Sequence, residues 1–278
     1  MNELMSLIGF SAAPMLTVAS FSLVSPVIGA MLSLRNEIML ALALPSIANA
    51  GMALGLLLGI DEGRSVSLFL FATASTLAVM IPALTGSLGT RSRELRLAGL
   101  FVAGQVLAML FMSLSTHAHT HIAHLLNGEV MAAGGFETAG IAAGCTGLLI
   151  GGILLRTRLY SWCADETFFR TGTTRYRLYA LSLYTLIAVT VTVGVATIGP
   201  LLVTALMVFP ALLSDIGKKG ADVYAVMVTA VGLTGSIFGF LCALVFDLPP
   251  AVCAAAGVGA VGMLLRAVVT TWRNAGSV

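Results

Sequence analysis

The sequence has very little charge: 9% of its 278 residues are Asp, Glu, Lys or Arg, whereas 58% are hydrophobic. The mean hydropathy is +1.02. It also lacks a long polar stretch, because the longest one, around Arg158–Arg177, spans only about twenty residues and is too short for a folded soluble domain. A glycine-rich phosphate-binding loop is absent as well, so any ATP hydrolysis is expected on another chain.

Metal-binding residue types are equally scarce. The four cysteines have no CxxC spacing, which argues against a zinc knuckle or a disulfide framework and favours small core residues. Histidine occurs four times, and all four lie within the eight residues 117–124. Neutral imidazole is a ligand for zinc and related metals, so this tract raises the hypothesis of a metal-handling protein.

Long uncharged runs make up most of the chain. Ile38–Ile60, Val66–Leu88 and Val223–Phe246 each hold about twenty residues, the length of a helix that crosses a hydrocarbon layer. They do not alternate as barrel strands do. The sequence therefore predicts an all-α polytopic membrane protein with about eight or nine transmembrane helices. The predicted spans are 9–34, 37–60, 66–88, 95–116, 137–157, 178–197, 200–214, 222–246 and 249–271.

The basic residues orient these spans. All but Arg64 of the 14 lysines and arginines fall in connections on one side, which the positive-inside rule makes cytoplasmic. The N-terminus is then outside and the C-terminus cytoplasmic. The connection 117–136, with every histidine, faces the exterior, whereas the arginine-rich segment 156–177 faces the cytoplasm and anionic lipid headgroups. The seventh span is short and begins at Gly199-Pro200, as half of a broken helix would.

Five segments, in order along the chain, resemble motifs of the metal-type ABC transporter permeases, the membrane subunits of zinc and manganese importers. Gly199–Ala211 is similar to the family's G-x-L-L-V-T-A-L-L-x-x-P-A stretch. The others are Gly29–Arg35 (G-x-x-L-x-L-R), Leu126–Val130 (L-F-G-D-I), Asp165–Gly172 (D-x-x-x-A-x-x-G) and Phe246–Ala251 (D-L-P-x-G).

The resemblance implies a type II ABC importer permease, with residues 1–278 forming a single transmembrane domain. Such a chain is a transport subunit and not an enzyme. The implied partners are a second permease chain, in a homodimer, cytoplasmic ATP-binding subunits that hold the ATP, and a periplasmic or extracellular metal-binding solute protein. No covalent cofactor and no nucleic acid are expected. The cargo is Zn²⁺, with Mn²⁺ second, and the location is the bacterial inner membrane.

The resemblance also assigns roles near the cytoplasm. The segment 210–220 corresponds to the element that couples the permease to its ATPase, through Pro210, Ala211, Asp215, Lys218 and Lys219. The alternative is a plain connector with lysines that extend to the interface. The chain turns through 217–220 and restarts at Asp222, an expected N-cap. At the outer boundary, Asp247 is expected to cap a helix or to contact the solute-binding protein.

The second span departs from the family, which has an Asp and, four residues later, a His. Leu42 and Ser46 occupy those positions here, and neither is a good zinc ligand. The span offers Ser46 and Asn49 instead as pathway-lining candidates, with Pro45 freeing backbone groups nearby. Asn49 and Gln105 are also typical of interhelical hydrogen bonds. Three explanations stay open: a low-affinity pathway, metal held by the histidines, or a cargo other than a bare ion.

The histidine tract supplies three imidazoles in either regular conformation. A helix puts His117, His121 and His124 on one face, whereas an extended chain groups His117, His119 and His121. Water or Glu129 could complete a tetrahedral site. The alternatives are a solvated loop and a pH-sensitive loop.

Three other functions stay open. The first is a secondary metal transporter or channel that works without an ATPase. The second is an ABC permease for a metal chelate or a small organic solute. The third is a membrane metal sensor that recruits a partner.

Replacing His117, His119, His121 and His124 together by alanine tests the metal hypothesis. We expect the purified transporter to lose bound zinc, because the tract holds all the imidazoles of the chain. Elemental analysis of the variant beside the wild type measures this. Equal metal content in the two would show that the tract binds none.

Overall fold

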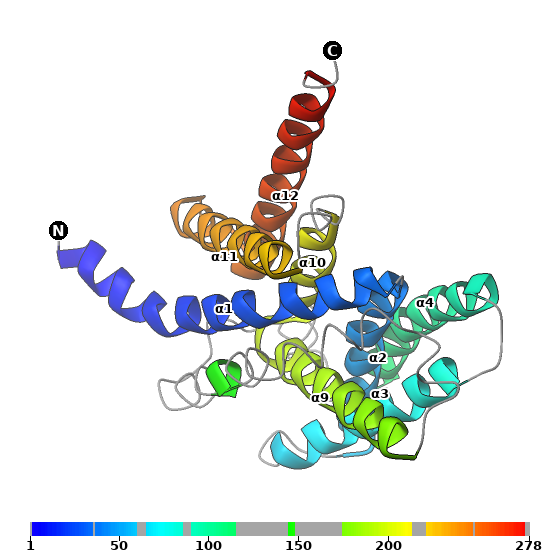
Figure 1. The fold of residues 1–278 in the computed structure, drawn as a ribbon. Helices are drawn as coiled ribbons and strands as arrows, with labels where there is room; N and C mark the ends of the chain where they lie inside the picture. Colours follow the sequence, from blue (N-terminus) through cyan, green and yellow to red (C-terminus); the bar gives the residue numbers. More distant parts are fainter. Residues whose placement is uncertain are drawn as a thin grey trace. The chain divides into compact units, whose positions relative to one another are not determined.

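The computed structural model is helical throughout the residues that it describes, which are 2–35, 37–59, 65–85, 90–114, 144–147, 174–212, 221–246 and 248–275. This confirms the predicted all-α fold (Figure 1). The main helices are α1 (Asn2–Leu34), α2 (Ile38–Leu57), α3 (Ser65–Thr85), α4 (Thr90–Leu114), α9 (Thr174–Ile198), α10 (Pro200–Val208), α11 (Ala221–Phe246) and α12 (Pro250–Ala275).

Six helices in the described part of the chain are long and apolar enough to cross a membrane. They are Ala13–Leu34, Ile38–Leu57, Glu94–Leu114, Leu181–Ile198, Asp222–Phe246 and Pro250–Thr271. Two shorter apolar helices, Ser67–Ala78 and Pro200–Leu212, correspond to the predicted third and seventh spans. The predicted fifth span, 137–157, lies outside the described residues except for 144–147. The chain is therefore a multi-pass membrane protein. Which side is cytoplasmic stays a prediction from the charges.

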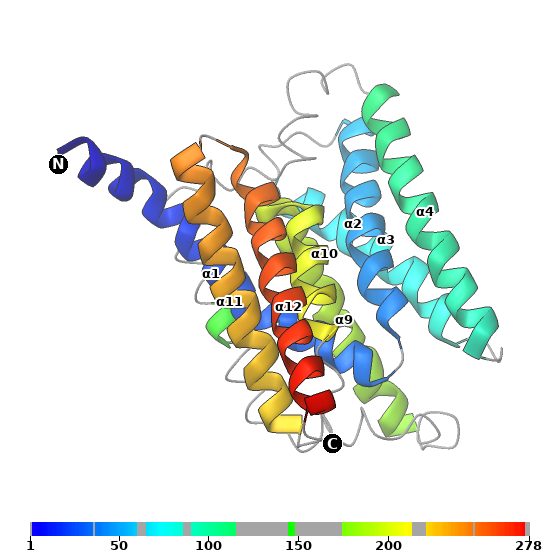
Figure 2. The same cartoon turned by 90° about the horizontal axis from the view of Figure 1, so that it is seen from above.

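The chain divides into two compact units, of which the first comprises Met1–Leu34, Glu129–Tyr160 and Ala205–Val278. Within it, α11 packs against both α1 and α12 (Figure 2). Its core joins Ala30 of α1 to Tyr224, Val228 and Val231 of α11, with Val261 and Leu265 of α12 packed alongside. A buried hydrogen bond of 2.7 Å between the hydroxyls of Ser22 and Ser236 also links α1 to α11.

Small residues allow α11 and α12 to approach closely. A Cβ atom added to Gly235 would lie 2.6 Å from the Cα atom of Val258. One added to Gly239 would overlap the carbonyl of Cys253 and lie 2.7 Å from the Cα atom of Ala254. Association of helices inside a membrane depends on such backbone contact, because lipid tails are as apolar as leucine and give no hydrophobic driving force. Glycine therefore has a packing role between α11 and α12.

The second unit comprises Arg35–Gly128 and Ser161–Thr204 and is centred on α2. The helices α3, α4 and α9 all contact α2, whose membrane-length span is 78% buried (Figure 2). Gly51 packs against Ala72 and Ser75 of α3, and Gly104 of α4 packs against the backbone of Ser46. By contrast, the span in α4 is only 22% buried, which leaves an apolar face for lipid or a partner.

The predicted broken helix is present at Gly199-Pro200. Gly199 has a φ of 87°, a left-handed conformation that glycine adopts without strain, and it ends α9. Its amide donates to the carbonyl of Val195 at 3.1 Å, and its carbonyl accepts from Val203 at 3.2 Å. The chain therefore leaves α9 and enters α10 with both backbone groups of Gly199 paired, as the interior of a membrane favours.

The substitution Gly235→Ala tests the close packing of α11 on α12. We expect it to lower the free energy of unfolding by about 2 kcal/mol, since its methyl group overlaps backbone that cannot move aside. Gly99→Ala in α4 is the matched control, because no atom lies within 4 Å of the added Cβ. Unfolding of both purified variants in detergent gives the comparison. Equal stability would show that close approach at Gly235 contributes nothing.

Candidate functional site

The two polar side chains of α2 are Ser46 and Asn49. They lie three residues apart and therefore on the same side of the helix. Ser46 is 1% exposed, and its hydroxyl donates to the carbonyl of Leu42 at 3.2 Å. The same oxygen accepts a hydrogen bond of 3.1 Å from the side-chain amide of Gln105 in α4. Gly104 makes this contact possible by letting α4 approach the Ser46 backbone. Ser46 therefore joins α2 to α4, and the expected interhelical role of Gln105 is confirmed.

Asn49 differs from Ser46, because neither polar atom of its side chain has a hydrogen-bond partner. It is 1% exposed. Burial of an unpaired amide costs about 2–7 kcal/mol, depending on the reference state. The interhelical hydrogen bond expected of Asn49 is thus absent from the described part of the chain. In α9, which contacts α2, the buried hydroxyl of Thr192 is also without a partner.

Most other hydroxyls in these helices are paired locally. Thr76 donates to the carbonyl of Ala72 at 2.7 Å, and Thr190 donates to that of Leu186 at 2.8 Å. Such bonds to the preceding turn satisfy Ser and Thr side chains without another helix. Among the described residues, the buried side chains of Asn49 and Thr192 are therefore exceptions.

The described part of the chain offers only neutral groups at this place. The span in α2 has no carboxylate and no imidazole, and Leu42 and Ser46 stand where the resemblance would place Asp and His. No group of three or more His, Cys, Asp or Glu side chains that could hold a metal occurs among the described residues. Amide and hydroxyl oxygens suit hard, oxygen-binding cations better than zinc.

An ion pair next to α2 was not predicted from the sequence. Arg35 and Glu37 pair at 3.2 Å, and their side chains are only 4% and 3% exposed. The hydroxyl of Tyr184 in α9 donates to the other carboxylate oxygen of Glu37 at 3.4 Å. From the sequence, Arg35 was expected in a connection on the cytoplasmic side. The acidic residue two positions later, directly before an apolar run, was the available signal for pairing.

The predicted coupling element is described in part. Pro210 and Ala211 are buried and lie in a single 3₁₀ turn that follows α10. The Tyr224 hydroxyl of α11 donates to the Ala211 carbonyl at 3.2 Å. In addition, the Phe209 ring lies against Gly259 of α12. The turn is thus attached to both α11 and α12.

Other predicted site residues lie outside the described residues. These are His117, His119, His121, His124, Glu129, Asp215, Lys218, Lys219 and Asp247.

Asp222 is described, and it lies in the first turn of α11, which begins at Ala221, so the expected N-cap role is wrong. A carboxylate in the first turn still interacts favourably with the helix dipole.

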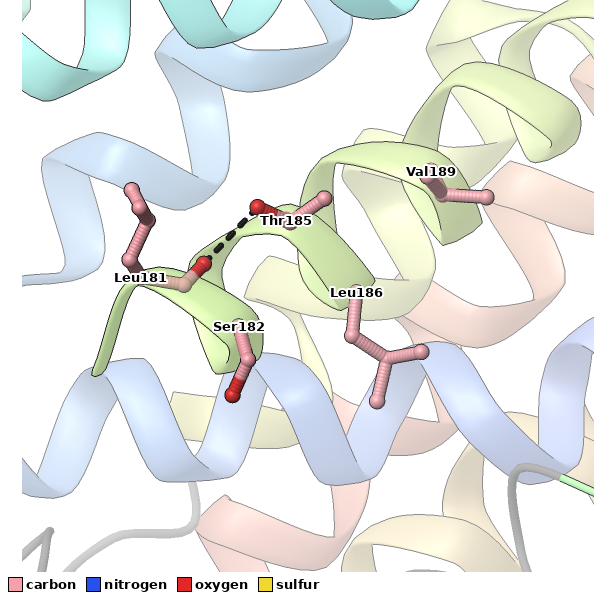
Figure 3. Close-up of a pocket in the computed structure, with 5 residues that line it drawn as sticks. All are labelled: Leu181, Ser182, Thr185, Leu186 and Val189. Atoms are coloured by element: carbon pink, nitrogen blue, oxygen red, sulfur yellow. Dashed lines mark hydrogen bonds between the residues drawn. The ribbon is translucent and has the colours of Figure 1, made fainter. Parts of the chain in front are cut away.

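A hollow of about 390 Å³ lies along α9, lined by Leu181, Ser182, Thr185, Leu186 and Val189 (Figure 3). The Thr185 hydroxyl donates to the Leu181 carbonyl of the same helix at 2.8 Å, the bond drawn in Figure 3. The leucines and the valine are exposed. An apolar exposed lining of this kind suits lipid tails and supplies no metal ligands.

Comparison with known proteins agrees with this architecture. The sequence profile described as the ABC 3 transport family matches residues 9–269. The chain belongs to the ABC 3 transport family. This confirms the resemblance to the metal-type ABC transporter permeases, so the chain is a membrane subunit of an ABC transporter. No curated protein matches the sequence significantly.

A solved structure shares the fold of this family member. The chain is similar to a chain in the structure of PsaBC from Streptococcus pneumoniae in complex with Fab, with a TM-score of 0.75 and 15% sequence identity. The match covers 95% of this chain and 94% of that chain. At this identity the likeness establishes the arrangement of helices and not the ligands.

The hydrogen bond between Gln105 and Ser46 can be measured by a double-mutant cycle. We expect Ser46→Ala and Gln105→Leu to show a coupling energy of about 0.6 kcal/mol, typical of interhelical hydrogen bonds in membranes. Unfolding of the two single variants and the double variant gives this value. Strictly additive effects would show that the two side chains do not interact.

Proposed function

We propose that this chain is the membrane-spanning subunit of an ATP-driven importer of a divalent transition metal, zinc first and manganese second. The observation that carries the proposal is the family match over residues 9–269 of a chain with six described membrane-length helices. The ATP-binding subunits, a solute-binding protein and a second copy of this chain complete the importer. The resemblance to metal importers supports a bacterial inner-membrane location, and the charge distribution supports a cytoplasmic C-terminus.

The described contacts support a route for coupling within the first unit. A force applied to the segment 210–220 by an ATP-binding subunit reaches Ala211, whose carbonyl is bonded to Tyr224. It also reaches α12 through Phe209, which packs on Gly259. Because α11 and α12 are packed backbone to backbone, they move together. Rigid-body movement of such helices is the usual basis of alternating access.

Metal capture and metal passage are assigned to different residues in this proposal. The outer tract His117, His119, His121 and His124, with Glu129, receives the ion from the solute-binding protein, which also contacts Asp247. Ser46 and Asn49 line the path inside the membrane. Imidazoles bind zinc firmly, whereas neutral hydroxyls and amides release it readily. An importer benefits from weak binding along the path because the cargo has to leave.

The neutral lining of α2 favours one alternative, an ABC permease for a metal chelate. A chelate carries its own ligands and needs neither the Asp nor the His that Leu42 and Ser46 replace. The family membership is the same in both cases. The two cargoes differ in whether added chelator promotes or prevents uptake.

Uptake into membrane vesicles that contain the complete transporter tests the proposal. We expect ATP-dependent accumulation of ⁶⁵Zn²⁺ that stops when the ATP-binding subunit is made inactive, because this chain has no phosphate-binding loop of its own. Vesicles with an inactive ATPase are the control. Uptake without any ATP-binding subunit would indicate a secondary transporter, and uptake that requires a chelator would indicate the alternative cargo.

A further inference from the structure

The segment Met207–Ala211, which we call the junction segment, joins α10 to the predicted coupling element 210–220. It contains the last residues of α10 and the start of the 3₁₀ turn. Pro210 has no amide hydrogen to donate, so α10 cannot continue through it. Residues of α1, α11 and α12, which all belong to the first unit, contact this segment. The contacts of the junction segment therefore determine which helices follow the coupling element when it moves.

The helix α12 contacts the junction segment through two glycines. A Cβ atom added to Gly259 would lie 3.1 Å from the ring of Phe209. One added to Gly262 would lie 3.3 Å from the carbonyl oxygen of Phe209. Both the ring and the backbone of Phe209 therefore lie against α12, which holds the turn on one side.

The helix α1 approaches the same segment near its C-terminal end. A Cβ atom added to Gly29 would overlap the carbonyl of Met207 and lie 2.7 Å from the Met207 Cα atom. Ala30 packs in one buried cluster with Tyr224 of α11. Ser33 lies one turn after Gly29 on the same face of α1, and its hydroxyl donates a hydrogen bond to the Tyr224 hydroxyl. The end of α1 thus contacts both the junction segment and Tyr224.

The Tyr224 hydroxyl connects these contacts to the backbone of the turn. It donates to the carbonyl of Ala211 at 3.2 Å and accepts from Ser33. Tyr224 and Ala211 are 1% and 3% exposed. A buried carbonyl without a partner costs free energy, and a hydrogen bond weakens steeply as its angle is distorted. The turn therefore cannot shift far from Tyr224 without a penalty.

We propose that the Tyr224 hydroxyl makes α1 move together with the coupling element, by linking Ser33 of α1 to Ala211 of the junction segment. The inference rests on the proposed function and adds α1 to the route through α11 and α12. Tyr224 is a positioning residue in this role, because it acts through the turn and α1. Movement of the turn without α1 would let ATP be hydrolysed while the first unit completes only part of its conformational change.

The substitution Tyr224→Phe tests this role, because it keeps the buried ring and removes only the hydroxyl. We expect the complete transporter in vesicles to hydrolyse ATP at nearly the wild-type rate. We expect it to accumulate ⁶⁵Zn²⁺ about fivefold more slowly, the factor that corresponds to one net hydrogen bond. The number of ATP molecules hydrolysed per zinc ion then rises by the same factor. A wild-type ratio would overturn the inference.

Ser22→Ala is the matched control for a general loosening of the unit. It removes the buried hydrogen bond of 2.7 Å between the hydroxyls of Ser22 and Ser236, which joins the same two helices, α1 and α11. Ser22 lies about three turns before Ser33 along α1. We expect this variant to keep the wild-type ratio of ATP to zinc. A ratio raised as far as that of Tyr224→Phe would show that any lost contact uncouples the transporter, and the inference would be wrong.

Ser33→Ala tests the connection to α1 separately. It removes the donor on α1 and leaves the hydrogen bond between Tyr224 and Ala211 in place. We expect a ratio of ATP to zinc between those of the wild type and Tyr224→Phe. A wild-type ratio would show that α1 is not coupled through Tyr224. This variant also decides the question if Tyr224→Phe fails to assemble with the ATP-binding subunits.

Failure of this inference is distinguishable from failure of the proposed function. If the wild type accumulates no zinc, or accumulates it without ATP hydrolysis, the proposed function is wrong and the inference falls with it. If the wild type couples ATP hydrolysis to uptake and Tyr224→Phe does so at the same ratio, only the inference is wrong.

Discussion

The constraint on which this structure depends is that every polar group inside a membrane has to find its partner within the protein. Apart from the carbonyls that prolines such as Pro45 leave without a helical donor, the helices satisfy their backbones internally. Most of their serines and threonines donate to the carbonyl of the preceding turn, as Thr76 and Thr190 do. At the break before Pro200, both backbone groups of Gly199 are still paired. Polar side chains can therefore occur in these spans without lowering the stability of the fold.

Helix association follows from the same constraint. Because lipid offers no hydrophobic drive, the helices are held by backbone contact at small residues and by a few hydrogen bonds. Gly235 and Gly239 bring α12 onto α11, whereas Gly51 and Gly104 bring α3 and α4 onto α2. The Ser46–Gln105 and Ser22–Ser236 hydrogen bonds supplement these contacts. The result is two compact units, each with a well-packed central helix.

Against this background, Asn49 and the pair Arg35–Glu37 have different meanings. The ion pair is buried but satisfied, and Tyr184 completes it. A pair of this kind fixes the start of α2, although removing its two charges from water costs free energy. Asn49 is buried and unsatisfied. The first is a structural feature of the helix start, and the second is a polar side chain that no hydrogen bond among the described residues satisfies.

Composition and charge were sufficient to predict the membrane helices that the structure describes, their approximate ends and the break before Pro200, because hydropathy and proline act locally along the chain. The order of short motifs was sufficient for the family. Only the tertiary structure showed that Ser46 is engaged by Gln105 while Asn49 is not, and that Arg35 is buried with Glu37. The partners of a side chain depend on which helix faces it, and the periodicity of a uniformly apolar span does not specify that.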